Sequence, residues 1–198
     1  RGESFDAPEN SLSAINLAWK RGAKAVEIDV HLTVDSHIVV IHDNDTDSVG
    51  DRKLIIANSK LNELKRVDIG VKKAKEFIGE KIPTLNEVFE TVPSDGKLII
   101  EVKCGTEIMD PLIQLMESKQ FQNNQIEFIS FKLEVITNIK EHFSNYKALW
   151  VLDLDYYWPH WLLRINPLKI IKTIEENRLD GADVWAGKVI NKSFVAAF

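Results

Sequence analysis

The sequence predicts an α/β fold built on a parallel sheet, and two observations predict it. Short apolar runs of strand type alternate along the chain with longer segments whose apolar residues recur every three to four positions. That alternation is typical of βαβ units, in which helices connect neighbouring parallel strands. The chain has 198 residues, 44% of them hydrophobic, so it can bury one sizeable core and favours a single domain.

The first expected element is a helix over residues 11–22. Its apolar residues Leu12, Ile15, Ala18 and Trp19 fall on one face. Asn10 or Ser11 can cap its start, and Gly22 ends it.

The remaining elements follow in order. Strands are expected at residues 23–30, 37–43, 96–103, 125–131, 146–152 and 181–187. Further helices are expected at residues 84–92, 107–119, 133–143 and 167–178, with a helix-like stretch at 191–198. The sequence TVDS between the first two strands has turn character, which implies a short connection. Residues 44–82 are the least regular part and predict a loop-rich excursion with a small helix near residues 61–67.

Composition excludes some classes of function. The formal net charge is -5, and basic residues are interspersed with acidic ones, which argues against a nucleic-acid surface. No apolar run reaches the roughly 18 residues of a membrane-spanning helix. The single cysteine, Cys104, excludes an intrachain disulfide and fits both the cytosol and a secreted domain.

Two carboxylates lie in a run that otherwise reads as buried strand. Glu27 and Asp29 are two residues apart, so they share one face of the strand. Glu101 and Lys103 repeat this spacing at the end of the strand at residues 96–103. A solvated polar face is one explanation. The other is a site for a hard divalent cation, Mg²⁺ or Ca²⁺, with Lys103 beside it for a phosphate oxygen.

His42 ends the strand-type run at residues 37–43. The carboxyl ends of strands carry the active sites of parallel α/β folds, so His42 is a candidate acid or base, although a lone histidine is more often a structural residue. His31 shares the parity of Glu27 and is expected at the surface or behind the site. His37, His142 and His160 are expected at the surface.

Several short motifs occur together in one order. They are RG (1–2), PENS (8–11), EID (27–29), HD (42–43), IPTL (82–85), EVK (101–103), SF (130–131) and WAGKVIN (185–191). This ordered set, above all EID followed by HD, resembles the glycerophosphodiester phosphodiesterase family. The resemblance implies a TIM (β/α)₈ barrel and cleavage of small glycerophosphodiesters, such as glycerophosphocholine or glycerophosphoethanolamine, to sn-glycerol 3-phosphate and an alcohol.

The resemblance also assigns roles to residues. It implies that Glu27, Asp29 and Glu101 are ligands of one divalent cation, and that His42 is one of two acid/base histidines. Arg1 and Lys103 are implied phosphate contacts. Glu9 is implied near the site, where it orients Arg1 or is simply an acid at a helix N-terminus.

The chain departs from the family at its ends. The family motif reads His-Arg-Gly, and its histidine would precede Arg1. A whole barrel has about 250 residues. We therefore expect residues 1–198 to form one barrel domain that lacks most of its first strand and all of its eighth.

An aromatic segment follows the strand at residues 146–152. Trp158 and Trp161 belong to it, and they are expected either to cap the barrel or to form an apolar wall beside the site. The wall leaves open a lipid-directed enzyme of the same fold, such as a lysophospholipase D or a sphingomyelinase D. A barrel that binds phosphodiesters without cleaving them is the other alternative, and the presence of the acids and His42 argues against it.

Overall fold

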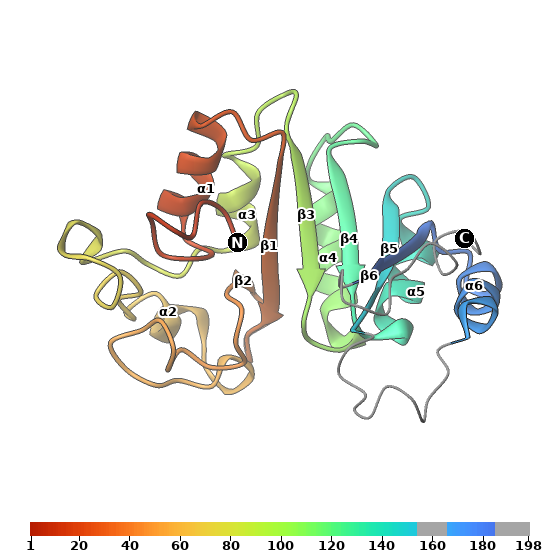
Figure 1. Cartoon of the computed structure of the whole chain (residues 1–198). Helices are drawn as coiled ribbons and strands as arrows, with labels where there is room; N and C mark the ends of the chain where they lie inside the picture. The colour runs from red at the N-terminus through yellow and green to blue at the C-terminus, as the bar shows by residue number, and fades with distance from the viewer. Residues whose placement is uncertain (154–165, 185–198) are drawn as a thin grey trace.

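The computed structural model describes residues 1–153 and 166–184, and these form a sheet with helices packed on it (Figure 1). The strands are β1 (Ala25–Leu32), β2 (Ile38–Val40), β3 (Lys97–Val102), β4 (Ile126–Ser130), β5 (Lys147–Leu152) and β6 (Gly181–Val184). The helices are α1 (Leu12–Lys20), α2 (Leu61–Leu64), α3 (Leu85–Phe89), α4 (Met109–Glu117), α5 (Leu133–His142) and α6 (Pro167–Glu176). The strands and helices predicted up to residue 184 are therefore present, whereas the stretch predicted helical at 191–198 lies outside the described residues.

The strands form one six-stranded sheet in the order β2-β1-β3-β4-β5-β6. The four neighbouring pairs β1-β3, β3-β4, β4-β5 and β5-β6 are parallel. The α/β fold with a parallel sheet is thus confirmed. In the described part of the chain the sheet is open, with β2 and β6 at its edges, so a closed barrel stays a prediction.

The pairing of β2 corrects one expectation. β2 is antiparallel to β1, with Val30 opposite Val40, and it spans only three residues. The physical reason is the length of the connection, because a few residues can form a hairpin but cannot make a parallel crossover. His42 therefore does not lie at the carboxyl end of a parallel strand.

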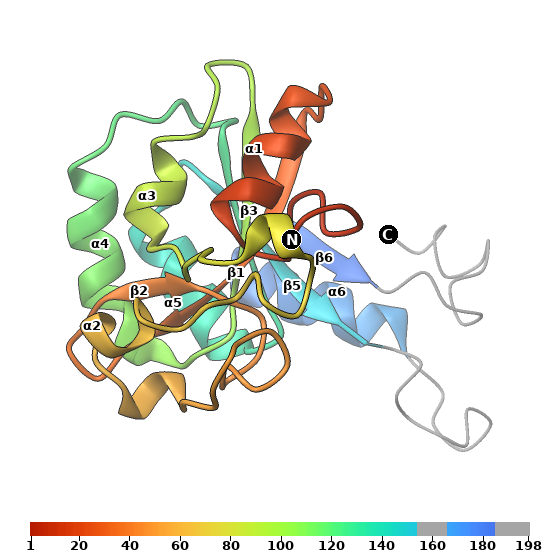
Figure 2. The same cartoon turned by 90° about the vertical axis from the view of Figure 1, so that its left-hand side faces the viewer.

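The two faces of the sheet differ in chemistry. One face buries aliphatic side chains such as Val26, Ile28 and Ile100 against α3, α4 and α5. Figure 2 shows these helices on one side of the sheet. The other face of β1 and β3 carries Glu27, Asp29 and Glu101, because side chains alternate along a strand.

The loop-rich excursion at residues 44–82 has a small core of its own. Aliphatic side chains from α2 and the loops around it are buried together with Val39 and Ile41, which belong to or follow β2. The excursion is therefore anchored to the edge strand that precedes the candidate histidine. None of the helices in the described residues has the length and apolarity needed to cross a membrane.

Candidate active site

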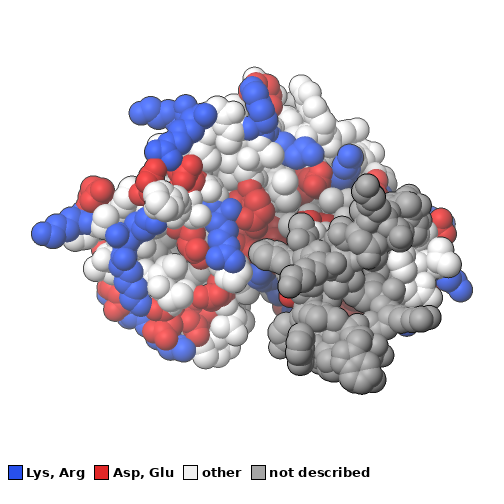
Figure 3. All heavy atoms as spheres, viewed as in Figure 1, with Lys and Arg blue, Asp and Glu red and all other residues white. Residues whose placement is uncertain are grey.

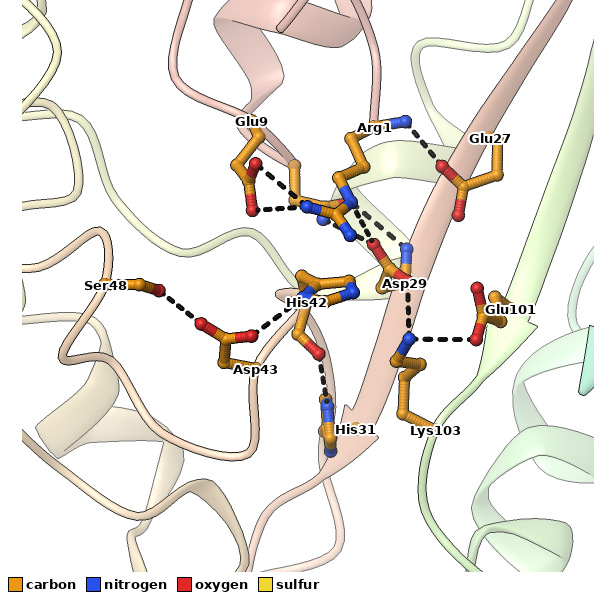
Figure 4. Close-up of polar contacts among 11 residues, drawn as sticks. Arg1, Glu9, Glu27, Asp29, His31, His42, Asp43, Ser48, Glu101 and Lys103 are labelled. Atoms are coloured by element: carbon orange, nitrogen blue, oxygen red, sulfur yellow. Dashed lines mark hydrogen bonds and ion pairs between the residues drawn. The ribbon is translucent and has the colours of Figure 1, made fainter. Parts of the chain in front are cut away.

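Parallel pairing of β1 with β3 brings three carboxylates together (Figure 4). Asp29 lies opposite Glu101 in the register, and Glu27 lies two residues earlier on the same face of β1. One oxygen from each of these three residues lies within 4.8 Å of the other two. Three oxygen donors at such separations could hold one hard divalent cation.

Asp29 is the most buried of the three, with a side chain that is only 1% exposed. Its Oδ2 accepts a hydrogen bond from Asn10 Nδ2 at 2.8 Å, and its backbone N–H donates to Asn10 Oδ1 at 3.1 Å. Its Oδ1 accepts no hydrogen bond, and the Lys103 ammonium lies 3.4 Å away. A buried carboxylate oxygen without a hydrogen bond is costly, and a cation would satisfy it.

Lys103 lies between the acids of the two strands. Its Nζ is 2.9 Å from Glu101 Oε1 and 5.9 Å from the centre of the Phe131 ring. Burial lowers the pKa of Lys103, but the carboxylates of Glu101 and Asp29 outweigh burial, so its pKa is raised overall. Lys103 is therefore a fixed positive charge at neutral pH.

Arg1 contacts the acids from the opposite side. Its guanidinium is 3.1 Å from Glu9 Oε2 and 3.4 Å from Asp29 Oδ2, and its backbone amino group is 2.5 Å from Glu27 Oε2. Nη1 of Arg1 donates to both carboxylate oxygens of Glu9, which supports the expectation that Glu9 orients Arg1.

The three acids repel one another. The pKa of Glu27 is raised, first by burial and then by the neighbouring Asp29 carboxylate. The Arg1 guanidinium, the Arg1 amino group and the Lys103 ammonium face the triad and offset part of this repulsion. The three oxygen donors also fit a divalent cation, which would offset the repulsion directly.

His42 lies beside the triad because of backbone contacts. The N–H of Ile41 donates to the Asp29 carbonyl at 3.0 Å, and His31 Nε2 is 3.1 Å from the His42 carbonyl. Burial lowers the pKa of His31, so its ring is neutral and Nε2 carries the proton that the carbonyl accepts. His31 thus lies directly behind His42, rather than at the surface.

The ring of His42 has a carboxylate partner. Its Nδ1 is 2.7 Å from Asp43 Oδ1, and the hydroxyl of Ser48 donates to the other oxygen of Asp43. Figure 4 shows the remaining ring nitrogen on the side of Asp29 and Lys103. His37 and His142 are exposed, as expected, and His160 lies outside the described residues.

A cavity of about 500 Å³ opens over these groups. Arg1, His42, Glu101 and Lys103 line its polar part. Its other lining residues are mostly apolar: Ile129, Phe131, Val151, Leu152 and Val184, with Asp153 and Asp183. The cavity can therefore hold a charged group beside the acids and a less polar group against β4, β5 and β6.

The predicted site residues converge, with one gap. Arg1, Glu9, Glu27, Asp29, His42, Glu101 and Lys103 lie in one connected group, whereas Trp158 and Trp161 lie outside the described residues. The sequence reasoning missed the contacts of Asn10 with Asp29 and of Asp43 with His42. Asn10 belongs to the motif PENS and Asp43 to the motif HD, so motif membership was the sequence signal that could have indicated these two contacts.

Figure 3 shows how charge is distributed on one face of the molecule. On the part of the viewed face that described residues form, Figure 3 shows acidic and basic side chains interspersed, without a broad area of one sign. This distribution agrees with the interspersed charges of the sequence.

Comparison with known proteins gives a consistent result. The model of the "Glycerophosphoryl diester phosphodiesterase family" matches residues 1–164. A glycerophosphodiester phosphodiesterase of Caldanaerobacter subterraneus subsp. tengcongensis is 36% identical over 149 residues, which are 72% of this chain and 61% of that protein. Glycerophosphodiester phosphodiesterase 1 of Homo sapiens is 34% identical over 148 residues, 71% of this chain and 44% of that protein. The chain therefore spans less than two thirds of the length of either relative.

Solved structures share the fold. A phosphodiesterase of Oleispira antarctica, in complex with the product sn-glycerol-3-phosphate, superposes with a TM-score of 0.74 at 23% identity, covering 99% of this chain and 94% of that one. A glycerophosphodiester phosphodiesterase of Thermotoga maritima gives a TM-score of 0.66 at 28% identity, covering 93% of this chain and 70% of that one.

Proposed function

Because the chain belongs to the glycerophosphoryl diester phosphodiesterase family, we propose that it hydrolyses small glycerophosphodiesters to sn-glycerol 3-phosphate and an alcohol. Glycerophosphocholine and glycerophosphoethanolamine are the proposed substrates. The reaction is proposed to need one divalent cation, Mg²⁺ or Ca²⁺, held by Glu27, Asp29 and Glu101. The names of the curated relatives and the product complex of the Oleispira antarctica enzyme support this substrate class.

The observation that carries the proposal is the composition of one site. Two basic side chains, a histidine and Glu101 line the polar part of a single cavity, and Glu101 clusters there with the carboxylates of Glu27 and Asp29. A phosphodiester is an anion that repels nucleophiles, so its cleavage needs positive charge next to the phosphate. A bound divalent cation would supply part of that charge as a Lewis acid.

The chain's own residues have distinct tasks in this proposal. Arg1 and Lys103 contact the phosphate oxygens and offset the charge that develops on them. His42 transfers a proton at Nε2, either from the attacking hydroxyl or to the leaving alkoxide. A second acid/base group is needed for the other of these two proton transfers.

Assay of the whole protein tests the proposal. We expect release of sn-glycerol 3-phosphate from glycerophosphocholine with added Mg²⁺ or Ca²⁺, loss of release with a chelator, and recovery with excess cation. Glu27→Gln should lower kcat/KM by about 100-fold or more. Glu117→Gln, an exposed change on α4, is the matched control.

Two outcomes would count against it. Absence of product from every glycerophosphodiester tried would overturn the activity. Turnover that ignores both the chelator and Glu27→Gln would overturn the cation requirement alone.

A second candidate, a lysophospholipase D, is favoured by one observation. The wall of the cavity formed by β4, β5 and β6 is mainly apolar, and it includes the half-exposed ring of Phe131. Such a wall suits an acyl chain as well as a small alcohol. Faster turnover of lysophosphatidylcholine than of glycerophosphocholine would select this candidate, and the reverse order would reject it.

A further inference from the structure

A chain of hydrogen bonds leads from the excursion to the candidate catalytic histidine. The hydroxyl of Ser48 donates a hydrogen bond to Asp43 Oδ2, and Asp43 Oδ1 is 2.7 Å from Nδ1 of His42. Each carboxylate oxygen of Asp43 therefore has one partner, and the two partners lie on opposite sides of it (Figure 4).

We propose that Asp43 is a positioning residue for His42, and that Ser48 holds Asp43 in place. The proposal rests on the proposed function, in which His42 transfers a proton. Asp43 accepts a hydrogen bond from Nδ1–H of His42, so the ring has one tautomer and one orientation, with Nε2 directed at the cavity.

The contacts around His42 make this orientation specific. The pKa of Asp43 is lowered, first by the Ser48 hydrogen bond and also by His42, so Asp43 is ionised at neutral pH and can only accept hydrogen bonds. On the other side, His31 holds the His42 carbonyl. The backbone and the ring of His42 are thus held by different residues, and neither contact uses Nε2.

The tautomer can be measured without any turnover. Nitrogen-15 labelling of histidine in the whole protein, followed by proton–nitrogen correlation at a pH where imidazole is neutral, identifies the protonated nitrogen. We expect His42 to carry its proton on Nδ1, and Asp43→Ala to give the mixed tautomers of a free imidazole. A proton on Nε2 in the unaltered protein, or an unchanged pattern in a folded Asp43→Ala variant, would overturn the proposal.

Kinetics test the role of Ser48. Asp43→Ala should lower kcat about 10- to 100-fold with little change in KM, as for other groups that orient a ligand or base. Ser48→Ala should lower kcat several-fold, and Ser48→Thr should restore it. In the Asp43→Ala background, Ser48→Ala should cause no further loss of kcat. Asp47→Asn, which removes a charge paired with Lys53 in the same loop, is the matched control.

The tautomer measurement and the kinetics together distinguish failure of the proposed function from failure of the positioning proposal. If the protein cleaves no phosphodiester, the proposed function fails while the tautomer still decides the positioning of His42. If the protein is active but additive losses are found in the double variant, Ser48 does not act through Asp43.

Discussion

Asn10 contacts Asp29 twice, through the carboxylate and through the backbone N–H. It has a φ of 57°, a left-handed conformation that asparagine tolerates better than most residues. The two hydrogen bonds and the left-handed backbone together explain why an asparagine occupies position 10, on the turn before α1. Ser11, rather than Asn10, caps the helix by accepting from the Ala14 N–H.

We therefore predict that Asn10→Ala destabilises the protein. The change removes both hydrogen bonds to a buried aspartate and places alanine in a left-handed conformation, which together cost about 2–4 kcal/mol. Guanidinium unfolding measures this loss. The exposed Asn58, replaced by alanine, should change stability by no more than about 0.5 kcal/mol. Equal effects of the two changes would show that the Asn10 contacts contribute little.

Cys104 is predicted to be unreactive in the native protein. Burial, followed by the Glu107 carboxylate, raises the pKa of its thiol to about 11. At pH 8 only about one thiol in a thousand is then ionised, and the thiolate is the reactive form. We expect alkylation by iodoacetamide to be at least about 100-fold slower in the native than in the denatured protein, and to accelerate as the pH rises toward 11. Equal rates in the two states would contradict the prediction.

At the residue scale, strand parity and the expected parallel sheet together predict that three carboxylates meet. Two carboxylates with a spacing of two must share a face, and a parallel partner strand places a third beside them. The pairing of Asn10 with Asp29 could not be predicted in this way, because it depends on how a loop folds over the strand. The reason for expecting His42 beside the acids was wrong, since the hairpin with β1, not the end of a parallel strand, brings it to Asp29, and its role as an acid or base stays a prediction.

At the scale of elements, Gly2 determines how closely the first loop approaches α1. Its φ is 70°, and a Cβ atom there would lie 2.7 Å from the backbone carbon of Ala14 and 2.8 Å from the Ile15 nitrogen. The glycine thus allows Arg1 to run directly past the helix to the acids. This requirement explains the Arg-Gly pair at the start of the sequence.

Gly2→Ala is predicted to destabilise the protein by about 3 kcal/mol or more and to lower its activity. The change adds steric overlap with the backbone to the cost of a left-handed alanine. Gly22→Ala is the matched control, because Gly22 also has a positive φ but its Cβ would have no neighbour within 4 Å. That control should cost only about 1 kcal/mol. Thermal unfolding of the two variants separates the cost of steric overlap from the cost of the left-handed conformation. Equal losses of stability would exclude steric overlap as a cause.

The order and type of most elements could be predicted, because apolar periodicity reports them directly. Helix α5, expected at 133–143, begins at Leu133 and ends at His142. The excursion was predicted as irregular apart from one small helix, which is α2 (Leu61–Leu64). The rest of its order comes from burial of residues distant in sequence, such as Val39 with Leu64 and Ile82. Periodicity contains no information on such contacts.

At the scale of the whole molecule, the sheet separates two environments. One face is an aliphatic core beneath helices, and the other holds charges around a cavity. The acids on that face are held by long-range pairing of β1 with β3 and by a loop from the N-terminal end. Stability of the fold and repulsion within the site are therefore coupled, and a cation bound by the triad would stabilise the molecule as a whole.

We predict that Mg²⁺ or Ca²⁺ raises the melting temperature. A ligand at about 100 times its Kd stabilises the native state by about 2.7 kcal/mol, or roughly 5–10 °C for a chain of this length. Glu27→Gln removes a ligand and also relieves repulsion with Asp29, so this variant should melt above the unaltered protein in chelator yet gain little from the cation. Sodium chloride at matched ionic strength controls for screening of surface charge. An equal rise with sodium, or an undiminished rise in Glu27→Gln, would show that the cation acts elsewhere than at the triad.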